Sequence, residues 1–149
     1  MLARLACFGL LTCGCLLPPP TQRASDAARE LNLAARFGRM DVALELTSTK
    51  LRPEFAKSRT EWGRSIRVMD VEMASFVMPA DNLARIEVDY AWSRVDEGIL
   101  RTTRVAQEWR DPGGGFQLES EARVAGDLGL LGEPLPPVEV RERRDVQFA

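Results

Sequence analysis

The fold of this chain is decided by residues 84–125, whose sequence in chain order is ARIEVDYAWSRV, DEG, ILRTTRVAQEWR, DPGGG and FQLESEARVA. The first segment, residues 84–95, alternates apolar and charged side chains with a period of two. That period is typical of a strand with one buried and one solvent-exposed face. Gly98 can adopt positive φ without steric cost, so DEG predicts a tight turn, and DPGGG predicts a looser one. We therefore predict an antiparallel meander of three strands.

The alternation also predicts which side chains of the meander face the protein interior. In the first strand they are Ile86, Val88, Tyr90 and Trp92; in the third strand, residues 116–125, they are Phe116, Leu118, Ser120, Ala122 and Val124. Glu119, Glu121 and Arg123 are expected to face solvent. In the middle strand, residues 99–110, either parity can face inward. One parity holds Ile99, Arg101, Thr103, Val105, Gln107 and Trp109, and the other holds Arg104 and Glu108.

Three helices are predicted before the sheet, over residues 25–37, 42–48 and 53–62. Ser25 and Asp41 are good N-terminal caps, and Pro53 suits the first position of a helix. In the third helix Phe55, Arg59 and Trp62 share a face. The aliphatic part of the Arg59 side chain can therefore cover the aromatic rings.

A longer strand, residues 66–78, is predicted between the helices and the meander. Its apolar parity changes at Met69-Asp70, which indicates a β-bulge and a bent strand. Helices followed by antiparallel strands are typical of an α+β domain. We predict N-terminal helices packed on a curved antiparallel β-sheet, with a cone-like shape.

Composition narrows the possible functions. A chain of 149 residues predicts one domain, and a net charge of −2 does not favour binding to nucleic acid. The sequence has no histidine, which excludes histidine-dependent catalytic triads and removes the commonest zinc ligand. We expect no metal site and no cofactor.

The N-terminus has the order of a secretory signal peptide. A short basic start at residues 1–4 is followed by an apolar run, small residues and Pro18-Pro19-Pro20. The apolar run is too short to cross a hydrocarbon core of about 30 Å. We expect a signal peptide over residues 1–14 and a proline-rich tether over residues 15–24.

The sequence Leu11-Thr12-Cys13-Gly14-Cys15 resembles the lipobox of bacterial lipoproteins. The resemblance implies that Cys15 is lipidated and becomes the mature N-terminus, inserting its acyl chains into the lipid bilayer. Cys13 is the second candidate, and a cleaved signal with incidental cysteines is the alternative. Leu16 replaces the aspartate that commonly retains such proteins at the inner membrane. In a Gram-negative cell this implies the outer membrane, on the periplasmic side.

The segment AARFGRMDVAL, residues 34–44, resembles the nuclear transport factor two-like domains, also called SnoaL-like or cystatin-like α+β cones. In that family an alanine-rich helix, a glycine and an aspartate lead into the second helix. The resemblance covers residues 25–125, and residues 126–149 are expected to form an irregular tail or an edge strand. Its members include isomerases, cyclases, dehydratases, secretion-system components and binding modules without catalysis, so the fold does not choose among these functions.

The candidate ligand pocket consists of aromatic residues expected inside the cone: Trp62, Tyr90, Trp92, Trp109 and Phe116. The alternative is that they fill the core between helices and sheet. Asp70, at the expected bulge, is the one carboxylate with a reason to point inward, although a solvated position is favoured. We assign no catalytic residue.

These features predict a non-catalytic envelope lipoprotein that presents its domain to a protein partner, a second copy or an apolar small ligand. The alternative is an isomerase or dehydratase of the SnoaL-like kind that acts on a small apolar substrate. An inward-facing carboxylate in a water-accessible pocket would favour the enzyme. A filled interior with an exposed apolar sheet face would favour assembly, and an open cavity lined by aromatic residues without converging charges would favour ligand carriage.

Overall fold

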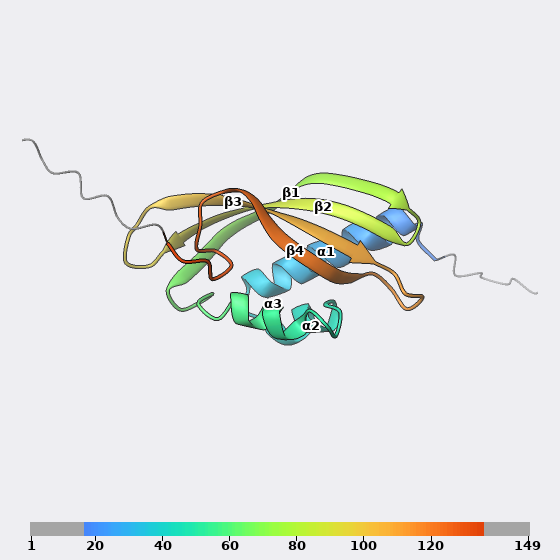
Figure 1. The fold of residues 1–149 in the computed structure, drawn as a ribbon, viewed down its shortest axis with the longest axis horizontal. Coiled ribbons are helices and arrows are strands. Elements are labelled where there is room, and N and C mark those ends of the chain that lie inside the picture. The colour runs from blue at the N-terminus through green and yellow to red at the C-terminus, as the bar shows by residue number, and fades with distance from the viewer. Residues whose placement is uncertain (1–16, 136–149) are drawn as a thin grey trace, which may run out of the picture.

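A computed structural model describes residues 17–135, and these form an α+β domain (Figure 1). Its elements are α1 (Pro20–Arg36), α2 (Met40–Glu45), α3 (Arg52–Ser58), β1 (Ile66–Ala80), β2 (Leu83–Arg94), β3 (Leu100–Arg110) and β4 (Gln117–Gly126). The helices lie on one face of a curved antiparallel sheet with strand order β1-β2-β3-β4. The predicted fold class is confirmed. Within the described residues no helix is both long and apolar enough to span a membrane.

The predicted meander is present as β2, β3 and β4. Val88 of β2 lies opposite Val105 of β3, and both side chains are buried against the helices. The turn between these strands contains Gly98 with φ of +64°. In β3 the parity of Val105, Gln107 and Trp109 faces inward, which resolves the choice that the sequence left open.

The bulge predicted in the first strand is also present. The register of β1 against β2 slips between Val68 and Asp70, and again between Met73 and Ser75. Each slip adds a residue and bends the strand. At the first slip Arg36, the last residue of α1, donates a hydrogen bond to the carbonyl oxygen of Met69. The bulge therefore joins the bent strand to the end of α1.

The helix bounds differ from the prediction. α1 begins at Pro20 instead of Ser25, so the last part of the expected tether is helical. Pro20 supplies the φ angle of a first helical residue, and Ala24 is fully buried, so packing extends the helix beyond its predicted cap. α3 ends at Ser58 instead of Trp62, because Arg59 leaves the helix and turns its side chain into the interior.

The predicted facing of the last strand is wrong beyond Leu118. Trp109 pairs with Leu118 and Glu108 pairs with Ser120, so Glu119 is an extra residue in β4. A single extra residue reverses the side-chain alternation that follows it. Glu121 consequently lies opposite the inward-facing Gln107, while Ser120, Ala122 and Val124 are exposed.

The residues after β4 are irregular but fold back onto the domain. The backbone N–H of Asp127 donates to the carbonyl oxygen of Thr102, and the Asp127 carboxylate accepts from the Thr102 N–H at 2.9 Å. Leu130 is fully buried, and its carbonyl oxygen accepts a hydrogen bond of 2.8 Å from the Trp62 indole. The described part of this segment therefore closes one end of the core.

Candidate functional site

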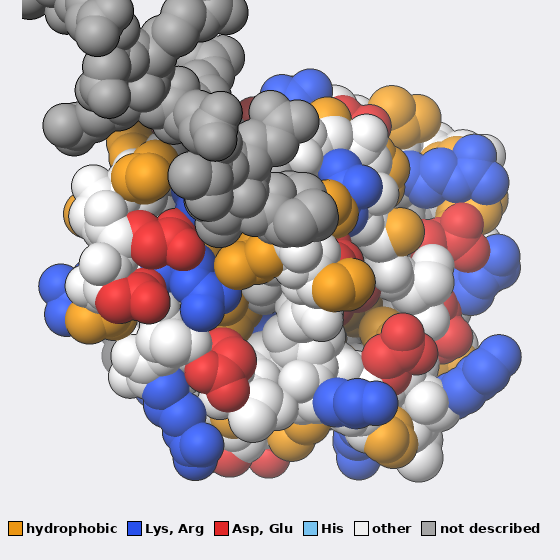
Figure 2. Space-filling model, turned by 60° about the vertical axis from the view of Figure 1, so that its left-hand side comes forward, with side chains coloured by type: hydrophobic (Ala, Val, Ile, Leu, Met, Phe, Trp, Pro, Cys, Tyr) orange, Lys and Arg blue, Asp and Glu red, His pale blue; other side chains and the backbone are white. Residues whose placement is uncertain are grey.

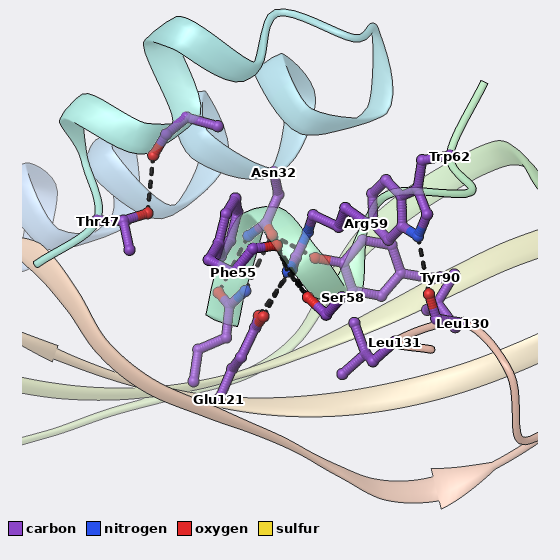
Figure 3. Close-up of polar contacts among 12 residues, drawn as sticks. Asn32, Thr47, Phe55, Ser58, Arg59, Trp62, Tyr90, Glu121, Leu130 and Leu131 are labelled. Atoms are coloured by element: carbon purple, nitrogen blue, oxygen red, sulfur yellow. Dashed lines mark hydrogen bonds and ion pairs between the residues drawn. The ribbon is translucent and has the colours of Figure 1, made fainter. Parts of the chain in front are cut away.

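The interior of the cone contains an ion pair between Arg59 and Glu121 (Figure 3). The two guanidinium nitrogens Nη1 and Nη2 donate to the two carboxylate oxygens at 2.5 and 2.7 Å. The Arg59 side chain is 0% exposed and that of Glu121 is 7% exposed. Arg59 follows the last residue of α3, and the bulge at Glu119 turns Glu121 inward. Two local irregularities thus bring these charges together.

Aromatic rings surround the arginine. The guanidinium carbon of Arg59 lies 3.6 Å from the ring centre of Phe55 and 4.9 Å from that of Trp62. The charged group, and not only its aliphatic stem, therefore covers the rings. Burial by itself would lower the pKa of Arg59, but the adjacent Glu121 carboxylate raises it above its ordinary value. Arg59 is therefore a permanent cation in the core.

A second buried polar cluster joins α1 to the sheet. The side-chain amides of Asn32 and Gln107 exchange hydrogen bonds of 3.1 and 3.0 Å, and Asn32 also donates to the carbonyl oxygen of Ala28 at 2.8 Å. The Tyr90 hydroxyl donates to Oδ1 of Asn32. The Trp109 indole donates to Oε1 of Gln107 at 3.3 Å. Both donors and both lone pairs of the Asn32 carboxamide are thereby used.

The pKa of Tyr90 is governed by its burial in this cluster. Burial raises the pKa of the Tyr90 phenol far above its ordinary value, even though the nearby Arg59 charge acts in the opposite direction. The phenol consequently keeps its proton at neutral pH and acts as a hydrogen-bond donor to Asn32. The two polar clusters hold the helices in place on the sheet.

The predicted pocket aromatics lie in or beside the hydrophobic core. Tyr90, Trp92 and Trp109 are fully buried, Phe116 is 3% exposed, and Trp62 is partly buried. The Trp92 indole donates to the Thr103 hydroxyl at 2.9 Å, so each of the three tryptophans has an internal hydrogen-bond partner. This burial supports the alternative that these aromatics fill the core. Their role in ligand binding stays a prediction.

Asp70, the carboxylate predicted at the bulge, does not enter the interior. The Asp70 side chain is 56% exposed and pairs with Arg36 at 3.4 Å. The expected lipidation site, Cys15, lies outside the described residues. Within residues 17–135 no three acidic or cysteine side chains are grouped as a metal site would require.

We consider two of the hollows at the surface. We call the first the helix–strand groove; its volume is about 440 Å³, and it is lined by Ala28, Arg29, Asn32, Leu33, Val71, Glu72, Met73 and Val88. We call the second the outer-face hollow; it crosses the solvent side of all four strands and has a volume of about 500 Å³. Small residues line much of the outer-face hollow: Ser75, Ala106, Ser120 and Ala122.

Charged side chains on the outer face of the sheet pair with one another. Arg104 donates two hydrogen bonds of 2.7 Å to Asp89 and lies 3.7 Å from Glu87. These hydrogen bonds lower the pKa of Asp89. Arg85 lies 3.5 Å from Glu108. The space-filling view also shows acidic and basic side chains interspersed over one face of the domain (Figure 2). This distribution does not resemble an electrostatic site for a single-sign ligand.

The structure resembles solved structures whose sequences differ widely from this one. A ketosteroid isomerase-like protein from Erwinia carotovora atroseptica has a TM-score of 0.59 at 9% identity, covering 73% of this chain and 99% of that one. An NTF2-like protein from Cytophaga hutchinsonii has 0.53 at 11% identity, covering 68% and 93%. A SEC-C motif containing protein from Rhodopseudomonas palustris has 0.57 at 14% identity, covering 66% and 77%. No protein-family model matches the chain, and no curated protein is significantly similar to it in sequence. These likenesses show the nuclear transport factor two-like fold alone.

Sequence reasoning missed both buried polar clusters. Asn32 offered a signal, because it follows Leu31 and lies four residues after Ala28 on the buried side of α1. Gln107 offered another, because it shares the parity of Val105 and Trp109. The sequence gives no indication that Glu121 is buried, because the alternation in its strand places it on the solvent side unless the bulge is known.

Proposed function

We propose that this chain is a non-catalytic envelope lipoprotein, tethered through Cys15, whose cone-shaped domain is an assembly module that binds a protein partner through the outer face of its sheet. One observation carries this proposal: most polar groups inside the cone are bonded to one another, and within the two clusters only Nε of Arg59 lacks a partner. An interior arranged in this way stabilises a fold and offers a ligand few unused donors or acceptors.

The state of the inward-facing carboxylate argues against the isomerase or dehydratase alternative. A general base must lie within hydrogen-bond reach of the substrate proton, so its carboxylate has to be accessible to the substrate. Both carboxylate oxygens of Glu121 already accept from Arg59, and its side chain is 7% exposed. Asp70 is exposed and paired with Arg36. The name of the ketosteroid isomerase-like neighbour therefore does not transfer to this chain as a function.

The outer-face hollow is a suitable place for a protein partner. Its alanine and serine side chains allow a partner to approach the strands closely, and Val77, which is 57% exposed, adds apolar area. The surrounding charges are already paired within the sheet, so an arriving surface does not have to neutralise them. Close packing in the centre and polar groups at the rim are typical of protein interfaces.

Site-specific photo-crosslinking in the native cell tests the outer face. The crosslinker replaces Ala122 in the hollow, and in the control it replaces Ala80, which is exposed at the end of β1. We expect a crosslinked protein, either another envelope component or a second copy, only from position 122. Equal crosslinking from both positions, or none from 122, would contradict assembly through this face. A small apolar ligand retained by the purified protein would instead support ligand carriage.

The proposed lipid anchor at Cys15 can be tested separately from the outer face. α1 begins at Pro20, so only four residues, 16–19, separate the helix from Cys15. The proposal places the domain close to the bilayer surface. Intact mass of the membrane-extracted chain should show a mature N-terminus at Cys15 with added diacylglycerol, lost in Cys15→Ala. An unmodified mature protein would contradict the anchor without affecting the outer-face proposal.

A further inference from the structure

The strand β1 is a free edge of the sheet. It is the first strand in the order β1-β2-β3-β4, and beyond the bridge between Ile66 and Trp62 its main-chain pairing among the described residues is with β2 alone. The stretch Val71–Met78 contains one charged residue, Glu72, and Met73 and Val77 are 38% and 57% exposed. Unpaired edges with little charge attract another strand, and natural proteins usually cover or disrupt them.

The helix–strand groove lies beside this part of β1. Leu33 and Ala28 of α1 form one wall, and Val71 and Met73 of β1 form the other. Its floor includes Asn32, whose amide is already fully bonded within the core. Arg29 and Glu72 also line the groove, and neither forms an ion pair with another described residue. The groove is thus apolar in the middle with one charge of each sign.

The described chain ends near the start of the same strand. Leu135 packs against Gly129, and Gly129 lies beside the ring of Trp92. Trp92 is the register partner of Val68 in β1. The N-terminal end of the described chain, which leads into α1, lies at the opposite end of the sheet (Figure 1). The described chain therefore ends at the same end of the sheet as the start of β1.

We propose that residues 138–148 add to the free edge of β1 as a parallel strand and insert side chains into the helix–strand groove. Residues 138–148 and 68–78 are runs of equal length, and each spans about 36 Å when extended at about 3.3 Å per residue. The even-numbered residues of the segment are Val138, Val140, Glu142, Arg144, Val146 and Phe148. Four of these six are apolar, as filling the groove requires.

The two charged members of that set complement the groove. Glu142 has the charge opposite to Arg29, and Arg144 has the charge opposite to Glu72. The odd-numbered residues Glu139, Arg141, Arg143, Asp145 and Gln147 are polar and face solvent in this arrangement. Main-chain hydrogen bonds to the edge supply affinity, and the alternate side chains select the register.

Hydrogen exchange of the full-length chain, with mass spectrometric readout of the β1 peptide, tests the proposal. One variant carries Val146→Asp with Phe148→Asp, and its control carries Gln147→Asp with Ala149→Asp; both add two negative charges in the same short stretch. We expect the outer-edge amides of Val71–Val77 to exchange at least tenfold faster in the first variant than in the wild type. The control should exchange like the wild type.

Three outcomes would overturn the proposal. The first is unprotected outer-edge amides in the wild-type chain, and the second is equal exchange in both variants. The third is protection that rises with protein concentration, which would assign the edge to a second copy. Exchange in β3 serves as the internal check that the domain remains folded. The proposal does not depend on the outer-face hollow or on lipidation, so it can fail while the proposed function stands.

Discussion

Arg59 and Glu121 are 62 residues apart in the sequence, yet their side chains meet in two hydrogen bonds inside the cone. The pair joins the end of α3 to the middle of β4. Such a pair is costly to desolvate, and its benefit lies in geometry: only one placement of α3 on the sheet satisfies both charges. We infer that this pair fixes the position of α3 on the sheet.

Removing one partner of this ion pair should be strongly destabilising. We expect Arg59→Met or Glu121→Leu alone to lower the free energy of unfolding by about 3–5 kcal/mol, because each leaves an unpaired buried charge. The double variant should recover most of that loss, because no charge is then stranded. Urea unfolding of the four proteins provides the measurement. Additive losses in the double variant would contradict the coupling.

Substitutions in the buried cluster of Asn32, Gln107 and Tyr90 should destabilise the domain by different amounts. Gln107→Leu removes a hydrogen-bond partner from both ends of the Asn32 amide and the acceptor of the Trp109 indole, so we expect a loss of about 3 kcal/mol. Tyr90→Phe removes a single donor to an oxygen that keeps another, so about 1 kcal/mol is expected. Thermal and urea unfolding measure both. A larger loss for Tyr90→Phe would show that the hydroxyl has a role beyond this cluster.

Acid should destabilise the domain through Asp111. Its carboxylate accepts from the N–H groups of Gly113 and Gly115 at 2.8 and 3.0 Å and pairs with Arg23 at 2.7 Å. The glycine N–H groups, and then Arg23, lower the pKa of Asp111 below its ordinary value of 3.8. A lowered pKa in the folded state contributes stability above pH 3.8, and this stability is lost as the pH falls through the folded-state value.

The measurement is the free energy of unfolding between about pH 5 and pH 2. It should fall with pH in the wild type and fall less steeply in Asp111→Asn, which cannot titrate at this position. The remaining slope should include Asp89, whose pKa the hydrogen bonds from Arg104 also lower. An identical slope in both proteins would contradict the assignment to Asp111.

Two glycines should differ in their tolerance to alanine. Gly98 has φ of +64° and open space around it, so Gly98→Ala should cost about 1–2 kcal/mol from the left-handed backbone alone. Gly126 has φ of +84°, and a Cβ there would collide with the carbonyl oxygen of Thr102. We expect Gly126→Ala to cost at least about 2 kcal/mol more.

The collision at position 126 should also loosen the segment that follows. Asp127 binds Thr102 directly, so a shift there should expose Leu130 and Trp62. Tryptophan fluorescence should therefore shift to longer wavelength in Gly126→Ala and remain unchanged in Gly98→Ala. Equal stability of the two variants would show that the strand end can move without cost.

Local sequence patterns predicted much of the fold. The alternation from Arg85 to Val95 identified β2, and the glycine turns located both ends of β3. The parity change at Met69-Asp70 located a bulge that is present between Val68 and Asp70. These predictions succeeded because each depends on side chains a few residues apart, where burial and turn geometry leave a direct pattern.

The sequence by itself determined the class of fold, the order of helices and strands, and most of the apolar residues of the core, because these follow from periodicity. Only the tertiary structure decided that α1 begins at Pro20, that α3 ends before Arg59, and that Glu121 faces inward. Each of these depends on a partner distant in the chain. A buried charge is tolerated only beside its counter-ion, and here the counter-ion is distant in the sequence. The extra residue Glu119 in β4 is defined by the register against β3, which the sequence of β4 alone does not show.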